Sequence, residues 1–226
     1  MINLTEEVID RIKEVVKLDP SEFTTLSADD DIFSKAVATI LSQNTNDRNS
    51  IKAYKRLREA VDIKPKAILS IEDRELIKAI KISGLYKQKL KSIKTLAQKV
   101  INELDGDLNR LRHVKLEEAK EWLKSIPGIG DKTADIILLH LGHPTFPVDT
   151  HISRITCRLG FTDRRRYSDV SRYWLDKLPR ERYLEAHLLL IKFGRSICQS
   201  RRPKCNICVL TETCKYYRED GEGCKT

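Results

Sequence analysis

Long apolar runs are absent from this 226-residue sequence, as are most signals of non-globular proteins. No stretch approaches the ~18 consecutive apolar residues of a membrane-spanning helix. Nine glycines and seven prolines are too few for a collagen-like or low-complexity chain. No segment alternates apolar and polar residues with the period of two that is typical of β-strands. These absences predict a globular, all-α protein that has no membrane partner.

Acidic residues are also fewer than basic residues. The chain has 42 Lys and Arg residues against 33 Asp and Glu residues, which gives a net charge of +9 and a pI near 9.2. Such an excess favours a polyanionic partner, most simply a nucleic acid. Residues 1–16 are acidic and amphipathic, unlike a signal or transit peptide. We therefore expect a cytoplasmic protein.

Apolar residues recur at helical spacing through most of the chain. Between Val8 and Val16, five valines and isoleucines share one predicted helix face, and Pro20 ends that helix. The pattern predicts about ten helices in all. Further predicted helices include Ile32–Ser42, segments around Tyr54 and after Pro65, Glu72–Ile80, Thr133–Leu141, a segment from Asp149 to Leu159, and Leu184–Ile191.

The cysteines gather at the end of the chain. Cys198, Cys205, Cys208 and Cys214 form the pattern C-x6-C-x2-C-x5-C. A disulfide framework is disfavoured, because no secretory signal is present and a helical core of this size needs no covalent cross-links. Four thiolates suit either a zinc ion or a [4Fe–4S] cluster. The irregular spacing, with only one C-x2-C pair, favours the cluster over zinc.

Three cations lie between the first two of these cysteines. Arg201, Arg202 and Lys204 occupy a short loop that would be held at both ends. Such a loop suits a phosphate contact, although it could also be an incidentally basic, solvated segment. Of the two remaining cysteines, Cys157 is predicted to be a buried apolar residue and Cys224 a free thiol in a polar tail.

A glycine-rich turn joins two helical patterns near residues 124–141. Gly128 and Gly130 in the string Ile-Pro-Gly-Ile-Gly are expected to adopt positive φ and to let the backbone approach a ligand closely. The unpartnered N–H groups of the following helix would face a phosphate. This pattern predicts a helix-hairpin-helix, which grips the DNA backbone without reading its sequence.

Two polar residues near this turn have more than one reading. Lys132 lies in the first turn of the second helix, where the helix dipole disfavours an ammonium ion. A neutral amine there could attack C1′ of a deoxyribose, whereas a charged one would bind phosphate. Asp149, 17 residues on, is a predicted helix N-cap, and its carboxylate could also stabilise a cationic sugar.

Taken together, the string from Lys124 to Ala134, the string Val148–Ile152 and the cysteine spacing resemble the endonuclease III family. Its members are helix-hairpin-helix DNA glycosylases of base excision repair. The resemblance covers essentially the whole chain and implies a [4Fe–4S] cluster on the four cysteines. It also implies double-stranded DNA with damaged bases or abasic sites as the partner, and a monomeric, prokaryotic protein.

The resemblance implies an all-α fold of two helical lobes. Residues 25–145 would form a six-helix lobe that contains the helix-hairpin-helix. Residues 1–24 with 146–226 would form a discontinuous lobe around the iron–sulfur loop 198–214. DNA would lie in a cleft between the lobes.

Site residues are carried over from the same resemblance. Lys132 corresponds to the nucleophile of bifunctional glycosylase/lyases, and Asp149 to the catalytic carboxylate. Leu85, in a Gly-Leu-Tyr turn, corresponds to a wedge inserted into the base stack. A family Gln fills the space that the flipped base vacates; ungapped alignment places Asn44 there, beside Gln43.

The activity so implied is removal of oxidised pyrimidines, followed by cleavage 3′ of the abasic site through β-elimination. A sibling glycosylase for uracil or thymine opposite guanine is the alternative, since Asn44 stands where the family has Gln. A non-enzymatic DNA-binding module would need neither Lys132 nor Asp149.

Overall fold

The computed structural model describes residues 4–219, and every regular element among them is helical. The all-α prediction is therefore confirmed. The described chain forms two compact units, one from residue 19 to 143 and the other from the residues before 19 together with those from 144 onward. No described helix has both the length and the apolar character needed to cross a bilayer.

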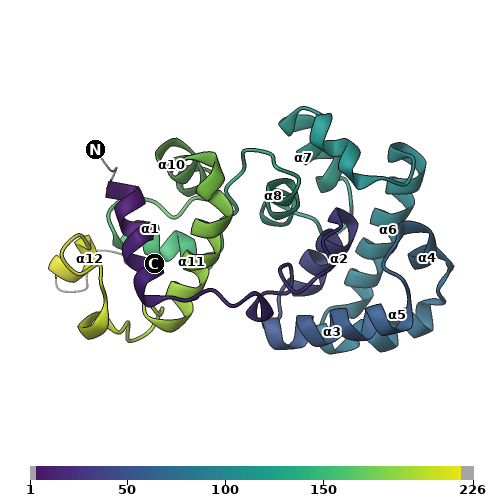
Figure 1. The fold of residues 1–226 in the computed structure, drawn as a ribbon, viewed down its shortest axis with the longest axis horizontal. Helices are drawn as coiled ribbons and strands as arrows, with labels where there is room; N and C mark the ends of the chain where they lie inside the picture. Colours follow the sequence, from purple (N-terminus) through teal and green to yellow (C-terminus); the bar gives the residue numbers. More distant parts are fainter. Residues whose placement is uncertain (1–3, 220–226) are drawn as a thin grey trace. The chain divides into compact units, whose positions relative to one another are not determined.

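The unit of residues 19–143 is built around helix α2 (Figure 1). Its α-helices are α2 (Ile32–Ser42), α3 (Asp47–Ala60), α4 (Pro65–Ser70), α5 (Asp73–Ile80), α6 (Tyr86–Leu104), α7 (Leu116–Lys124) and α8 (Asp131–His140). Three 3₁₀ segments join them: η1 (Pro20–Glu22), η2 (Lys81–Ser83) and η3 (Leu108–His113). Asp31 caps α2 by accepting a hydrogen bond from the Ser34 N–H at 3.0 Å.

Helix α2 is largely apolar, which is typical of a helix buried in a core. All but two of its residues are buried, and it contacts α3, α6 and α8. The core around it draws apolar side chains from every helix of this unit. This arrangement fixes the C-terminal end of α2 beside α8, the second helix of the predicted hairpin.

The second unit collects the first helix and the C-terminal part of the chain. Its elements are α1 (Leu4–Val15), α9 (Thr150–Arg158), α10 (Tyr167–Lys177), η4 (Arg180–Arg182), α11 (Tyr183–Ser196), η5 (Cys205–Ile207) and α12 (Lys215–Arg218). Helix α11 packs against both α1 and α9. Trp174 stacks on Phe146 with ring centroids 5.5 Å apart, and its Nε1 donates to Thr156 Oγ1 at 2.9 Å.

The first helix joins this unit through both apolar and ionic contacts. Val8, Ile9 and Ile12 are buried, and Lys13 pairs with Glu185 of α11 at 2.6 Å. Val15, predicted to share the buried face, is exposed instead. At 3.6 residues per turn, Val15 lies at the edge of the stripe that Thr5, Val8, Ile9 and Ile12 form, whereas the next residue, Val16, is buried.

Candidate DNA-contacting site and four-cysteine centre

The predicted hairpin is formed by α7, the turn 125–130 and α8. Gly128 has φ +85°, and a Cβ there would lie 2.7 Å from Ser92 Oγ and 3.1 Å from Gln88 Nε2. Ser92 Oγ also donates to the Pro127 carbonyl at 2.5 Å. A side chain at Gly128 is therefore opposed by both backbone conformation and space.

Gly130 behaves differently from the prediction. Its φ is −100° rather than positive, and a Cβ there would meet nothing within 4 Å. The reason is that Gly130 is the N-cap residue of α8, and an N-cap takes an extended conformation. Gly130 leaves open space in front of the first turn of α8, whose N–H groups have no partner within the helix.

Lys132 lies on that first turn, with an exposed side chain. It lines a pocket of about 260 Å³ within the unit of residues 19–143. The lining residues are Thr39, Ser42, Gln43, Asn44, Gln88, Gly128, Lys132, Thr133 and Ile136. Four residues named from the sequence thus share one pocket: Gln43, Asn44, Gly128 and Lys132. Gln88 and Thr133 were missed, because neither carries a motif of its own.

The two candidate void-filling residues have different environments. Gln43 Nε2 donates to the Gly128 carbonyl and to Thr133 Oγ1, both at 2.9 Å. Its amide therefore ties the end of α2 to the hairpin. Asn44 is exposed and has a left-handed backbone with φ +48°.

Leu85 is presented at an exposed turn before α6. Its side chain is 52% exposed, and it has φ +47° directly after Gly84 at φ +70°. A large apolar side chain in a left-handed conformation is uncommon. The turn therefore holds an apolar side chain in water, as a wedge residue would require.

Lysines of α7 pair with acidic residues of α8. Lys124 Nζ lies 3.2 Å from Asp131 Oδ1, and Lys120 Nζ lies 2.9 Å from Asp135 Oδ1. Hydrogen bonds with Glu121 and Asp131 raise the pKa of Lys124. These pairs join the two hairpin helices and partly offset the acidic charge beside Lys132.

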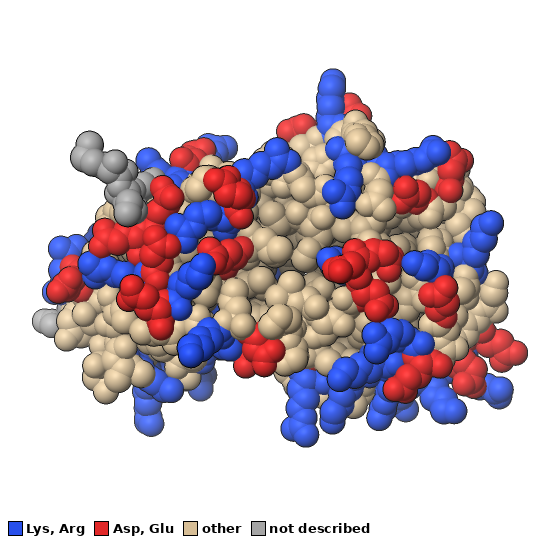
Figure 2. All heavy atoms as spheres, in the orientation of Figure 1, with Lys and Arg blue, Asp and Glu red and all other residues tan. Residues whose placement is uncertain are grey.

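Basic side chains also line helix α3. Its exposed positions carry Arg48, Lys52, Lys55, Arg56 and Arg58. In Figure 2 blue side chains gather along the lower edge, where Figure 1 places α3, with red acidic side chains among them. The basic excess of the sequence is therefore concentrated in part on this helix, in a mixed rather than uniform patch.

Asp149 is the N-cap of α9, in the second unit. Its Oδ1 accepts a hydrogen bond from the Ile152 N–H at 2.8 Å, and its side chain is half-buried. Burial lowers the pKa of the nearby His151. The predicted cap is present; it uses Oδ1 and leaves Oδ2 outside this bond.

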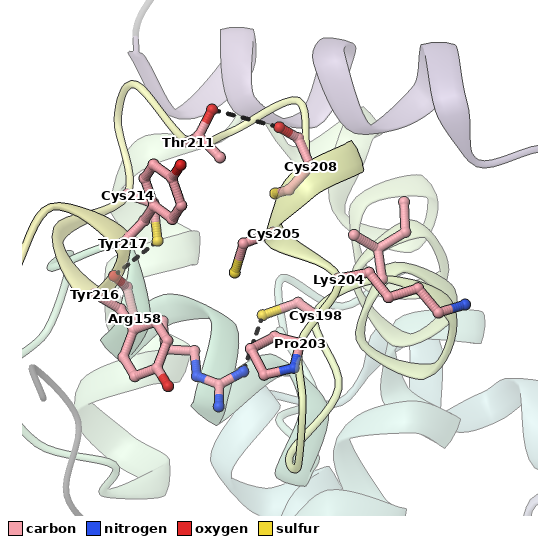
Figure 3. Close-up of a pocket in the computed structure, with 11 residues that line it drawn as sticks. Arg158, Cys198, Pro203, Lys204, Cys205, Cys208, Thr211, Cys214, Tyr216 and Tyr217 are labelled. Atoms are coloured by element: carbon pink, nitrogen blue, oxygen red, sulfur yellow. Dashed lines mark hydrogen bonds between the residues drawn. The ribbon is translucent and has the colours of Figure 1, made fainter. Parts of the chain in front are cut away.

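Cys198, Cys205, Cys208 and Cys214 line one pocket, with their side chains gathered around it (Figure 3). All four are free thiols. Burial raises the pKa of Cys205, Cys208 and Cys214, that of Cys208 to about 11. Such thiols ionise when a cationic metal centre compensates for their burial. In the described part of the chain, no three or more His, Cys, Asp or Glu side chains are arranged so that they could hold a metal ion together.

Two arginines of α9 hold the segment that carries these cysteines. Arg158 donates to Cys198 Sγ at 3.4 Å and to the Gln199 and Ser200 carbonyls at 2.7 and 3.1 Å. Arg154 donates to the Cys198 carbonyl at 2.9 Å. Four cysteine sulfurs around one pocket are the donor set that a thiolate-bound metal group uses, and the two arginines hold the segment that carries the first of them.

The basic loop begins directly after Cys198. Arg201 and Arg202 are exposed, and Arg202 has a left-handed φ of +53°. The Lys204 N–H closes the loop on the Ile197 carbonyl at 3.0 Å. The arginines therefore extend from a fixed backbone. The prediction for Cys157 was wrong: it is half-buried in α9 and disulfide-bonded, not a buried apolar residue. Cys224 lies outside the described residues.

These features define a class: an all-helical chain with a glycine-rich helix-hairpin-helix and a four-cysteine loop. The sequence matches the HhH-GPD superfamily of base excision DNA repair proteins over residues 37–180. Endonuclease III of Sulfolobus acidocaldarius is 36% identical over 225 residues, which are 97% of this chain and 99% of that protein. Endonuclease III of Thermotoga maritima is 31% identical over 93% of each chain.

Solved structures agree with these relatives. A trapped endonuclease III–DNA covalent intermediate matches with a TM-score of 0.74 and 25% identity, over 96% of this chain and 97% of that one. A non-covalent endonuclease III–DNA complex matches with a TM-score of 0.75 and 26% identity, over 96% of each chain. The chain belongs to the endonuclease III family of the HhH-GPD superfamily.

Proposed function

We propose that this protein is a bifunctional DNA glycosylase and abasic-site lyase that removes oxidised pyrimidines from double-stranded DNA as a monomer. The observation that carries the proposal is the position of Lys132. Its amine stands on the first turn of the hairpin's second helix and lines a pocket with Asn44 and Gly128. A pure DNA-binding hairpin would need no amine in such a pocket.

Lys132 acts as the nucleophile. Its neutral amine attacks C1′ of the damaged nucleotide, the N–C1′ bond forms, and the bond from C1′ to the base breaks. Loss of a proton from the amine and opening of the sugar ring give an imine. The imine acidifies the C2′–H; when that proton leaves, the C3′–O bond breaks and the 3′-phosphate departs.

Asp149 supplies the carboxylate that this chemistry requires. The sugar gains positive charge while the base departs, and a negative group stabilises that charge. The same carboxylate accepts the proton that the attacking amine releases. Its N-cap bond to the Ile152 N–H fixes the orientation of the side chain, because one oxygen is held by the helix.

The base is reached by extrusion from the duplex. Leu85 wedges into the stack, which its exposed position and left-handed turn support. Asn44 fills the vacated space. Gln43 is less suited to this role, because its amide is already bonded to Gly128 and Thr133 of the hairpin.

The DNA backbone is held by two separate features. The N–H groups at the start of α8 bind one phosphate across the open space at Gly130. Arg201 and Arg202 bind phosphate from the fixed loop after Cys198. Cys198, Cys205, Cys208 and Cys214 hold a [4Fe–4S] cluster that stabilises this loop when bound.

A panel of duplexes tests this function. Each duplex carries one oxidised pyrimidine, uracil opposite guanine, thymine opposite guanine or a preformed abasic site. Base release and β-elimination products with oxidised pyrimidines, and strand cleavage at the abasic site, are the expected results. Excision confined to uracil or thymine opposite guanine would assign the sibling activity. Binding without excision of any base would reduce the protein to a DNA-binding module.

A further inference from the structure

A lysine is buried inside the unit of residues 19–143. Lys89, near the start of α6, is 1% exposed. Its Nζ donates to the Leu41 carbonyl at 2.8 Å and to the Ser83 carbonyl at 2.7 Å. Burial lowers the pKa of Lys89 to about 8. A buried ammonium ion persists only where its hydrogen bonds are made, so these two carbonyls are its essential partners.

The two carbonyls belong to the two turns whose side chains enter DNA in the proposed function. Leu41 lies in the last turn of α2, where carbonyl groups lack partners within the helix, three residues before Asn44. Ser83 ends η2, two residues before Leu85. One ammonium ion therefore connects the void-filling turn to the wedge turn.

Both turns carry a strained residue. Asn44 has φ +48° and Leu85 has φ +47°, two of the four non-glycine residues with positive φ in the described part of the chain. Such conformations persist where the surroundings enforce them, and they cluster at functional sites. The N–H of Lys89 also donates to the Leu85 carbonyl at 3.0 Å, so Lys89 holds the wedge turn through its backbone as well.

We propose that Lys89 is a positioning residue for base extrusion, which holds Leu85 and Asn44 at a fixed relative position before DNA binds. The inference rests on the proposed function, in which these two side chains enter the duplex. Lys89 acts through two backbone carbonyls and touches neither DNA nor the reacting atoms. Because both turns are already held before DNA binds, less conformational entropy is lost when their side chains are inserted.

The same helix offers a matched control. Lys94 is half-buried in α6, and its Nζ donates to the Leu69 and Ile71 carbonyls at 3.3 and 2.7 Å. It therefore also uses one ammonium ion to hold two carbonyls at a helix end. The Leu69 carbonyl lies in the last turn of α4 and the Ile71 carbonyl at its C-cap, away from the turns assigned to DNA; Lys94 also pairs with Asp73 Oδ1 at 3.2 Å. If Lys89 had a purely structural role, the Lys89→Met and Lys94→Met variants should have the same ratio of excision rates on duplex and single-stranded DNA.

The test compares single-turnover excision of thymine glycol, an oxidised thymine, from a paired duplex and from the same single strand. For Lys89→Met, the duplex-to-single-strand rate ratio should fall by about 10- to 100-fold, the range expected when positioning is lost. For Lys94→Met, the ratio should stay within about twofold of wild type. Thermal unfolding of each variant reports any change in stability separately. Equal ratios in the two variants would overturn the proposal.

A double-mutant cycle with Leu85→Ala gives a second readout that a structural role would not move. If Lys89 acts through Leu85, the Leu85→Ala change should lower the duplex-to-single-strand rate ratio much less in the Lys89→Met background than in wild type. Additive effects would contradict the proposal. Lys89→Gln removes the charge that the two carbonyls hold, so it serves as the cycle's second variant should Lys89→Met fail to fold.

The activity of the wild-type protein distinguishes a failure of the proposed function from a failure of the positioning role of Lys89. If the wild-type protein excises no base and forms no imine, the proposed function is wrong. If the wild type is active but the Lys89 cycle is additive, only the positioning role fails.

Discussion

Asp149 has two roles that substitution can separate, because it is both the N-cap of α9 and the proposed catalytic carboxylate. Asn is as good a cap as Asp, whereas Ala costs about 1 kcal/mol at an N-cap. For a chain of this size, 1 kcal/mol lowers the Tm by about 2–4 °C. We therefore expect Asp149→Asn to leave the Tm nearly unchanged and Asp149→Ala to lower it by that amount.

Catalysis, unlike the Tm, should not distinguish the two variants. Both variants of Asp149 lose the negative charge, so both should slow base excision by about 10²- to 10⁴-fold, the usual contribution of a positioned acid–base group. The assay is single-turnover excision with enzyme in excess over an oxidised-pyrimidine duplex. The affinity of Asp149→Asn for an undamaged duplex should stay within about twofold of wild type, because Asn preserves the cap.

Another N-cap in the same chain provides the control. Asp31 caps α2 through the same type of bond, to the Ser34 N–H at 3.0 Å, but has no proposed role in catalysis. Asp31→Asn should therefore keep full excision activity. If Asp149→Asn is as active as Asp31→Asn, Asp149 is only a cap and the proposed mechanism loses its carboxylate.

The remaining predictions concern the cluster, the phosphate contacts and the hairpin. Purified protein should contain about four irons per chain; Cys205→Ser should lose them and Cys157→Ser should not, as iron analysis will show. The double alanine variant at 201–202 should flatten the log–log salt dependence of DNA binding by up to about two units, and an unchanged slope would assign these arginines to solvent. Gly128→Ala should lower the Tm, because its φ of +85° and the Ser92 contact oppose a Cβ. Gly130→Ala should lower the Tm less than Gly128→Ala, because a Cβ there meets nothing, but it should weaken DNA binding by blocking the open space.

Sequence periodicity was sufficient for the helices and for the local motifs. The apolar run of α2 and the cap at Asp149 are properties of neighbouring residues, so these features followed from the local pattern. The positive φ expected at Gly130 was wrong, because a glycine permits that conformation without requiring it. The capping position decided the outcome.

Contacts between distant residues could not be predicted in this way. Gln43 bonds to Gly128 and Thr133, more than eighty residues away, and no local signal marks that pairing. Lys89 was missed for a related reason: in a helix start rich in lysine, a single buried lysine looks like the exposed ones around it. Only the packing of α6 against α2 distinguishes it.

The identity of the residue that becomes covalently attached to DNA tests the mechanism most directly. Wild-type protein is incubated with an oxidised-pyrimidine duplex and borohydride, which reduces the imine to a stable bond, and the cross-linked peptide is sequenced by mass spectrometry. The adduct should lie on Lys132, and Lys132→Gln should form none while still binding undamaged duplex. An adduct on another residue, or an undiminished adduct in Lys132→Gln, would contradict the proposed nucleophile.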